Sequence, residues 1–268
     1  MGNGEWGMGN ETWLAVSHVE IVYHRGMKSL YVHLLPDLVD ESDLFGQTTV
    51  VIDCLRATST IAYALAAGAR EVIPCLEVDE ARTRASQFPK SSVLLGGERQ
   101  GVRIEGFDLG NSPTEYTPGV VAARSIVFTT TNGTRAMQRC REARRVVMGA
   151  LVNRSAVVEA LASDRVVHIV CAGTRGRITR EDALAAGAIG SWLVERGDWN
   201  PDDEARLAIA AWEAVRTGDL VAALHDTQGG RNLVAEGFEN DIATCARLDA
   251  IDLAPELDVK SWTIPARP

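Results

Sequence analysis

The stretch Asp53-Cys54-Leu55-Arg56-Ala57-Thr58-Ser59-Thr60 brings a carboxylate, a guanidinium and several hydroxyls close together along the chain. Because it follows an apolar run, Asp53 stands at the end of an expected buried strand, where it can hold a metal ion or attack phosphorus. Arg56, Thr58 and Ser59 stand at the expected start of a helix, where free N–H groups favour an anion. The alternative is structural: Asp53 ends the strand and a hydroxyl caps the helix.

Residues 96–113 form a second candidate segment, which holds five glycines together with Glu98, Asp108, Asn111 and Ser112. Oxygen ligands on loops suit Mg²⁺, which takes a few carboxylates and keeps several of its waters. The alternative is that the glycines only form turns and that Asn111 and Ser112 only cap a helix. The density of both features in one stretch favours a site.

A third segment, residues 128–135, again joins an expected strand to an expected helix through a small polar loop. Its backbone N–H groups and side chains could cradle an oxyanion. The Asn-Gly pair is also typical of a hairpin turn, but the helical pattern after it argues against a hairpin. The candidate binding residues are Thr131, Asn132, Gly133, Thr134 and Arg135.

The fourth segment runs from Cys171 to Arg177 and fits C-x5-R, the spacing of cysteine-dependent phosphatases. Gly173 and Thr174 lie inside this loop and are candidate binding residues. Position 170 is valine, whereas those phosphatases usually carry a histidine there. A buried, inert thiol before a glycine turn is therefore the favoured interpretation of Cys171.

These four segments need strands that carry their loops to a common place. Continuous Val/Ile-rich runs, rather than alternating ones, predict strands buried on both faces, as in a parallel sheet covered by helices. The sequence thus predicts an α/β fold with largely parallel sheets flanked by helices and a helical C-terminal third. The expected strands are 30–35, 49–53, 71–74, 93–95, 125–129, 145–148 and 166–170; the expected helices are 60–67, 79–87, 134–140, 155–161, 180–195 and 202–216.

Two of these helices carry recognisable start signals. Thr179 and Asp182 have the spacing of a capping box, in which a hydroxyl and a carboxylate three residues later satisfy free N–H groups. Asn200 and Pro201 predict a cap and a first-turn proline for the following helix.

The hexapeptide at 64–69 recurs identically at 183–188, in each case shortly after a cysteine that ends an apolar run. The repeat is consistent with two similar α/β halves that arose by internal duplication, with chance convergence of two Ala-rich helices as the alternative. We therefore expect a first half over 27–150 and a second half with extra helices over 151–268. Residues 1–26 begin Gly/Asn-rich and are expected to be a flexible extension.

Composition excludes several classes of protein. The net charge of −9 argues against nucleic-acid binding, which needs a basic face. No apolar run approaches the length of a membrane span, and the start of the chain lacks the basic and apolar regions of a signal peptide. The five cysteines form no CxxC pair, which favours free thiols in a reducing cytoplasm. Of the 27 basic residues 24 are arginine, which suits small oxyanions.

Taken together and in order, the four segments resemble the 2-phosphosulfolactate phosphatase family. The likeness rests on Asp53–Ile61, Gly97–Arg99, Gly106–Pro113, Thr130–Thr134 and Cys171–Thr174, and extends from about residue 27 to about residue 252. The resemblance implies a Mg²⁺-dependent hydrolysis of 2-phospho-3-sulfolactate to 3-sulfolactate and phosphate, a step associated with coenzyme M biosynthesis. The arginines available for that anionic substrate are Arg56, Arg99, Arg135, Arg175 and Arg177.

On this basis Asp53, Glu98 and Asp108 are the expected catalytic carboxylates and the expected ligands of Mg²⁺. Three alternatives stay open: a phosphatase of another 2-hydroxy acid phosphate, a metal-independent phosphatase that uses Cys171, and a non-catalytic anion-binding protein. The expected partner is a small anion that carries phosphate, carboxylate and sulfonate, with neither nucleic acid nor membrane involved. A homodimer is the assembly that base rates favour.

Overall fold

The strands of the computed structural model, which describes residues 27–266, form two separate sheets. The larger sheet has the order β10-β7-β2-β8-β1-β9 and is parallel except for the edge strand β10. The predicted extension over 1–26 lies outside the described residues. The strands of the larger sheet are β1 (Lys28–His33), β2 (Thr48–Ile52), β7 (Arg145–Gly149), β8 (Val166–Cys171), β9 (Trp199–Pro201) and β10 (Glu256–Leu257).

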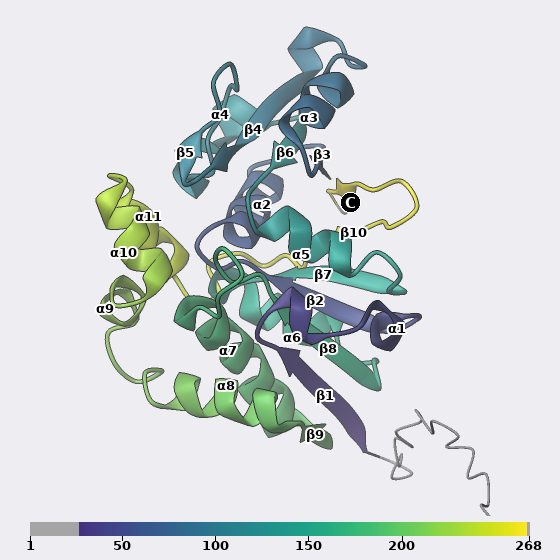
Figure 1. Cartoon of the computed structure of the whole chain (residues 1–268), viewed down its shortest axis with the longest axis vertical. Helices are drawn as coiled ribbons and strands as arrows, with labels where there is room; N and C mark the ends of the chain where they lie inside the picture. Colours follow the sequence, from purple (N-terminus) through teal and green to yellow (C-terminus); the bar gives the residue numbers. More distant parts are fainter. Residues whose placement is uncertain (1–26, 267–268) are drawn as a thin grey trace, which may run out of the picture.

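The smaller sheet has the order β11-β3-β6-β4-β5, with parallel pairing at its centre and antiparallel pairing at both edges. Figure 1 shows it above the larger sheet, so that helices lie between the two. Its strands are β3 (Glu71–Pro74), β4 (Val93–Arg99), β5 (Val102–Arg103), β6 (Ser125–Thr129) and β11 (Ile264–Pro265).

Helices fill the space between the sheets and cover their outer faces. Apolar side chains of α2 (Ala57–Ala66) and α5 (Gly133–Arg139) share one buried cluster with residues of both sheets. On the far face of the larger sheet, a second cluster buries α6 (Arg154–Ala160), α7 (Arg180–Arg196) and α8 (Asp203–Glu213). The outer face of the smaller sheet is covered by α3 (Val78–Ala85).

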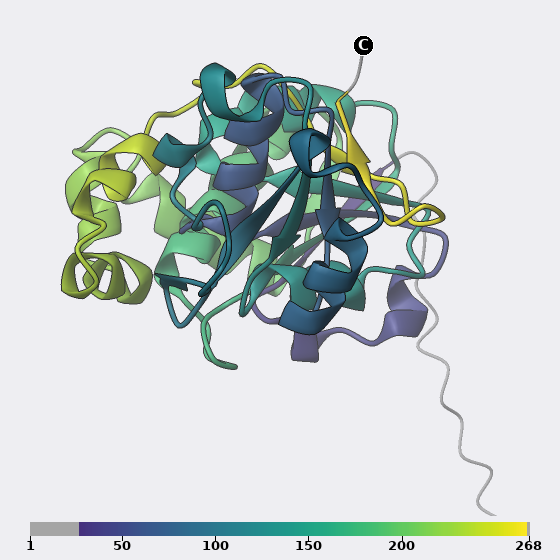
Figure 2. The ribbon, with the colours of Figure 1, turned by 90° about the horizontal axis from the view of Figure 1, so that it is seen from above.

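The remaining helices are short. Three of them, α9 (Leu220–His225), α10 (Gln228–Ala235) and α11 (Glu239–Cys245), form a group beside the two sheets (Figure 2). The others are α1 (Glu41–Leu44) and α4 (Pro118–Val121), together with 3-10 turns at Pro36–Leu38, Lys90–Ser92, Pro113–Glu115 and Leu151–Asn153. Within residues 27–266, no helix combines the length and the apolar character needed to cross a membrane.

The predicted α/β class, the mainly parallel pairing and the helical C-terminal part are confirmed. The sheets, however, do not divide the chain at residue 150, because the larger sheet takes strands from both sides of it. After β2 the chain leaves the larger sheet, builds the centre of the smaller one and returns at β7. Apolar patterns predict where strands lie, but they carry no information on which strands pair.

The repeated hexapeptide lies at the ends of two equivalent units. The helices α2 and α7 follow β2 and β8, which are adjacent parallel strands of the same sheet. The helices pack on opposite faces of that sheet, because their apolar residues belong to different buried clusters. The repeat therefore describes two strand–loop–helix units of one sheet rather than two separate sheets.

The capping interactions predicted for both helices need correction, although α7 begins at Arg180 as predicted. Thr179 does precede α7, but its side chain caps no N–H group, and the Asp182 carboxylate instead accepts from the backbone of Cys54 and Gly173. The next helix is capped by Asp202, whose carboxylate accepts from the Ala205 N–H at 2.7 Å, while Asn200 and Pro201 belong to β9. Tertiary hydrogen bonds and strand pairing override the local signals.

Two buried histidines face each other across β1 and β8. Nε2 of His33 lies 3.0 Å from Nδ1 of His168, and the ring of Tyr31 stacks on His168 with centroids 4.8 Å apart. Burial lowers the pKa of both to about 4; the charge of His168 adds to the effect on His33, and Asp43 opposes it. The folded protein therefore keeps this pair neutral.

We expect the free energy of unfolding to fall as the pH drops from 6.5 towards 4, because the unfolded chain binds protons on these histidines and the folded chain does not. A pKa shift of this size changes the free energy of unfolding by about 3 kcal/mol for one histidine. Urea denaturation at a series of pH values measures the effect. The double variant His33→Gln, His168→Asn should flatten the profile; a profile parallel to that of the wild type would contradict this account.

Candidate active site

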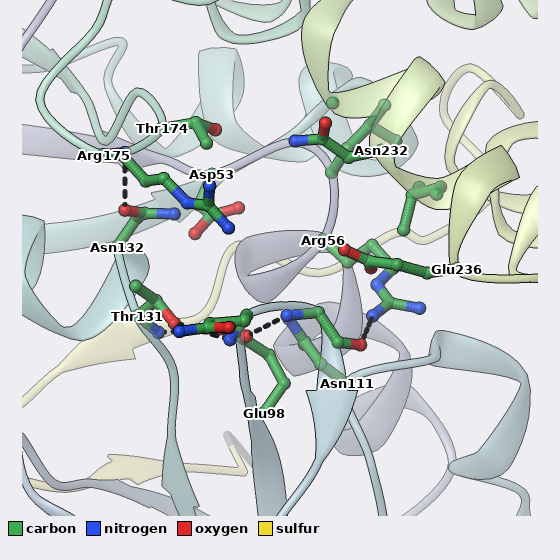
Figure 3. A pocket seen from close by; sticks show the side chains of 15 residues that line it. Asp53, Arg56, Glu98, Asn111, Thr131, Asn132, Thr174, Arg175, Asn232 and Glu236 are labelled. Carbon is green, nitrogen blue, oxygen red and sulfur yellow. Dashed lines mark hydrogen bonds between the residues drawn. The ribbon is translucent and has the colours of Figure 1, made fainter.

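The carboxyl ends of strands from both sheets meet at one pocket. Loops after β2, β6 and β8 contribute to it, as does the end of β4, and α10 covers it from the side (Figure 3). Ends of parallel strands are where α/β proteins collect ligands. The lining residues are Asp53, Leu55, Arg56, Glu98, Gln100, Gly101, Asn111, Thr131, Asn132, Thr174, Arg175, Gly229, Asn232, Leu233 and Glu236.

Asp53 follows the last residue of β2, and its side chain points into the pocket (Figure 3). The residue is only 8% exposed, and one carboxylate oxygen accepts from the Ala57 N–H at 3.2 Å. Burial raises the pKa of Asp53 to about 7. The nearby Glu98 and Glu181 carboxylates contribute to this increase, whereas the Ala57 N–H and Arg56 act in the opposite direction. A nearby cation would therefore strongly stabilise the ionised form of this carboxyl group.

The segment that presents Asp53 is held by two hydroxyls from the first turn of α2. Thr58 accepts from the Asp53 N–H at 3.1 Å and donates to the Asp53 carbonyl at 2.9 Å, and Ser59 donates to the Cys54 carbonyl at 2.8 Å. Both side chains are fully buried and neither lines the pocket. Thr58 and Ser59, predicted to bind substrate, therefore fix the position of Asp53 instead.

Gly133, at the start of α5, lies against the Asp53 carboxylate. A Cβ atom at this position would come within 2.8 Å of Oδ2 of Asp53 and 2.7 Å of the Ala57 Cβ. The predicted ligand-binding glycine thus acts by leaving room for the carboxylate. Its neighbour Thr134 donates to the Thr130 carbonyl at 2.8 Å and lies outside the pocket.

Glu98 joins two of the loops around the pocket. Its Oε1 accepts from the Thr131 N–H at 2.7 Å, and its Oε2 accepts from the Gly101 N–H at 2.7 Å and from the Thr131 hydroxyl at 3.2 Å. The side chain is buried and lines the same pocket as Asp53. Two of the three predicted carboxylates are therefore brought together.

Asp108, the third predicted carboxylate, lies away from the other two. It lies exposed at the surface, where its carboxylate accepts from the Leu95 N–H at 2.8 Å, and it does not line the pocket. Among residues 27–266, no three histidine, cysteine or acidic side chains are placed together so that they could hold a metal.

Arg56 lines the pocket but is held by protein groups. Its guanidinium pairs with Asp241 at 2.5 Å, donates to the Gly101 carbonyl at 3.0 Å and lies 4.3 Å from the ring centre of Phe238. Asp241 also accepts from the hydroxyl of Ser112 at 2.7 Å. Ser112, predicted to bind substrate, therefore anchors α11 and with it the position of Arg56.

Polar groups able to donate to an anion surround Asp53 (Figure 3). The side-chain oxygen of Asn132 accepts from the Arg175 N–H at 3.2 Å, and that of Asn232 accepts from Gln228 at 2.8 Å. Both amides thus keep their NH₂ groups for a ligand. Thr174, which also lines the pocket, adds a hydroxyl.

The other predicted residues have different places. Gly173, with φ of +61°, donates its N–H to Asp182 at 2.9 Å and forms the start of a turn. Arg135 lines a neighbouring groove beside α1 rather than this pocket. Arg99 is bonded to the Leu76 carbonyl at 2.7 Å and to the Thr129 hydroxyl at 2.9 Å. These residues shape the surroundings of the pocket.

Sequence reasoning missed the wall formed by α10 with Gly229 and Asn232 and by Glu236, which follows that helix. One signal was available: the Gly229-Gly230 pair has no side chains, which allows close approach of other groups. A Cβ atom on Gly229 would lie 2.2 Å from a carboxylate oxygen of Glu181. Asp182, which joins the loops after β2 and β8, was assigned only a local capping role.

Comparison of the sequence with known proteins identifies its family. A family model described as 2-phosphosulpholactate phosphatase matches residues 33–260. The chain belongs to the 2-phosphosulfolactate phosphatase family. It is 44% identical over 216 residues to a probable 2-phosphosulfolactate phosphatase of Symbiobacterium thermophilum, covering 80% of this chain and 92% of that protein. Proteins with the same name from Caldanaerobacter subterraneus subsp. tengcongensis and Deinococcus radiodurans are 41% and 42% identical, over 82% and 85% of this chain and 91% and 92% of theirs.

In this member of the 2-phosphosulfolactate phosphatase family, Cys171 is poorly placed to be a nucleophile. It ends β8, is 1% exposed and does not line the pocket. Burial raises the pKa of its thiol well above the usual range, and Asp182 adds to the effect. A thiol that stays protonated is a weak nucleophile. The structure thus argues against the cysteine-phosphatase alternative.

We expect Cys171→Ala to retain its phosphatase kcat/KM within about twofold, because the side chain reaches no ligand; removing a small buried group costs about 1 kcal/mol of stability. Phosphate-release kinetics and thermal unfolding test this. The wild-type enzyme should also keep its activity in iodoacetamide. Loss of activity in either experiment would return the cysteine to the mechanism.

Proposed function

We propose that the protein is a Mg²⁺-dependent phosphatase that hydrolyses 2-phosphosulfolactate to 3-sulfolactate and phosphate. The observation that carries the proposal is one pocket that combines two buried carboxylates, Asp53 and Glu98, with the amides of Asn132 and Asn232. This pocket lies within the part of the chain that matches the family. A protein that only bound anions would gain nothing from carboxylates at this position.

The residues present fit a magnesium ion, with Asp53 and Glu98 as its carboxylate ligands. Mg²⁺ is usually held by one or two carboxylates together with waters and substrate phosphate, so a third acidic residue is unnecessary. Asn111 adds support: its Oδ1 is buried and, among the described residues, has no hydrogen-bond partner. Asn111 thus joins Asp53 and Glu98 as a candidate ligand, whereas Asp108 does not. When bound, the ion would supply positive charge that neutralises the transferring phosphoryl group.

The residues of the chain itself would orient the ester. In our proposal the NH₂ groups of Asn132 and Asn232 and the hydroxyl of Thr174 donate to oxygens of the phosphate, and α10 shields the pocket from bulk water. Preorganised donors of this kind stabilise developing charge because they need not reorient during the reaction. Glu98 holds the loops of Thr131 and Gly101 together, which fixes the width of the pocket.

The cytoplasm stays the proposed location, since all five cysteines are free, buried thiols. The homodimer stays a prediction from base rates.

Metal removal tests the proposal. Phosphate release from 2-phosphosulfolactate should require Mg²⁺, fall by at least about a hundredfold in EDTA and return when excess Mg²⁺ is added. Release from 2-phospholactate serves as the comparison for another 2-hydroxy acid ester. EDTA-resistant release would exclude the carboxylate–metal mechanism, and faster release from 2-phospholactate would favour the alternative substrate.

A further inference from the structure

Beside the pocket lies a second, strongly basic chamber of about 770 Å³. It shares Thr174, Arg175 and Asn232 with the pocket, so the two spaces adjoin. Four arginines and one aspartate are its charged lining residues: Arg175, Arg177, Arg180, Arg231 and Asp226. In a chain with a net charge of −9, this concentration of guanidinium groups attracts an anion.

Arg175 occupies the boundary between the two spaces. Its side chain extends from the turn after β8 into the pocket (Figure 3). Within residues 27–266, the guanidinium forms neither a hydrogen bond nor a salt bridge, in contrast to Arg56, Arg180 and Arg231. Arg175 is thus a cation with donors available for a ligand.

The backbone at Arg175 is unusual for an arginine. Arg175 and Gly176 have φ of +52° and +70°, and Thr174 and Arg177 exchange N–H···O bonds of 2.9 and 3.1 Å across them. Such a turn, with two positive φ angles, favours asparagine followed by glycine. A bulky residue held in the left-handed region points to a functional demand on its side chain. The turn is fixed by Asn132 on one side and by Asp182 at Gly173 on the other.

We infer that Arg175 and the basic chamber form the subsite for the sulfonate arm of the substrate. The inference rests on the proposed function. Of the two acidic groups beside the ester, the sulfonate lies one bond further from phosphorus than the carboxylate and so extends further from the pocket. Asp53, Glu98 and Glu236 would repel it in the rest of the pocket. The planar fork of Arg175, which lines both the pocket and the chamber, can donate two parallel hydrogen bonds to it.

The test compares 2-phosphosulfolactate with 2-phospholactate, which lacks the sulfonate, in wild-type protein and in Arg175→Asn. Asparagine suits the turn, so the variant should fold with an unchanged or higher Tm. We expect kcat/KM to fall about 30-fold for the sulfonated ester and less than about threefold for 2-phospholactate, the loss expected for a charge-assisted hydrogen bond. Arg82→Gln, on α3, controls for removal of a surface guanidinium and should change neither value.

A binding measurement separates this inference from the proposed activity. By calorimetry, Arg175→Asn should weaken the binding of 3-sulfolactate about 30-fold and leave that of lactate unchanged. Equal losses for both esters would show that Arg175 acts on the phosphate or carboxylate and would overturn the inference, as would unchanged kinetics. A wild-type protein that binds 3-sulfolactate through Arg175 but hydrolyses neither ester would contradict the proposed function alone.

Discussion

Asp53→Asn should lower kcat for phosphate release by roughly 10³-fold or more while the fold is retained, a loss typical of removing an essential charged group from a catalytic site. The amide keeps the size of the carboxylate and the oxygen that accepts from the Ala57 N–H. Since burial raises the pKa of Asp53 from 3.8 to about 7, its ionisation lowers the free energy of unfolding between these pH values, and the cost is fully present above pH 7. In metal-free buffer at pH 8, the variant should therefore be at least as stable as the wild type.

The matched control is Asp108→Asn, the same change at a carboxylate that sequence reasoning placed in the site and the structure places at the surface. We expect its kcat within about twofold of the wild type, since it reaches no pocket group. Steady-state kinetics and thermal unfolding of the wild type and the two variants test whether Asp53 is required for turnover. Near-normal turnover in Asp53→Asn, or equal losses in both variants, would remove Asp53 from its assigned role.

Gly133→Ala should lower kcat about a hundredfold, because the added methyl group displaces the carboxylate of Asp53 and a misplacement of about 1 Å has that cost. The new Cβ would stand 2.8 Å from Oδ2 of Asp53 and 2.7 Å from the Ala57 Cβ, so one of these groups must move. Overpacking of this kind also costs about 1–3 kcal/mol of stability.

Gly119→Ala is the control for this substitution. Gly119 lies in the short helix α4, and a Cβ there would meet no atom within 4 Å. Its turnover should match the wild type, and its unfolding free energy should be equal or slightly higher. If Gly133→Ala loses stability but keeps kcat, the contact between Gly133 and Asp53 has no catalytic importance.

The positions of the strands could be predicted because buried parallel strands carry continuous Val/Ile runs. The expected strands at 71–74 and 125–129 coincide with β3 and β6. Asp53 could be predicted in the same way, since a carboxylate at the end of such a run lies where ligands collect. Asn132 and Thr174 follow strands too, and the fold brings them to the same pocket.

Other parts of the site depend on contacts between distant parts of the chain. Arg56 pairs with Asp241, 185 residues away, and no local pattern announces that pair. Hydroxyls present a second limit. Thr58 and Thr174 both follow a strand closely along the chain, yet Thr58, in the first turn of α2, bonds to the backbone of Asp53, whereas Thr174 lines the pocket. Only the folded geometry distinguishes Glu98 from Asp108, because both are acidic residues in one glycine-rich stretch.

The central claim is that the phosphate ester is bound and hydrolysed in the pocket of Asp53. A crystal structure of the Asp53→Asn variant with 2-phosphosulfolactate and Mg²⁺ tests it most directly. The account predicts the phosphate in that pocket, against Asn132 and Asn232, with the sulfonate directed towards Arg175. An ester bound elsewhere, for example in the groove between α3 and Trp262, would contradict it.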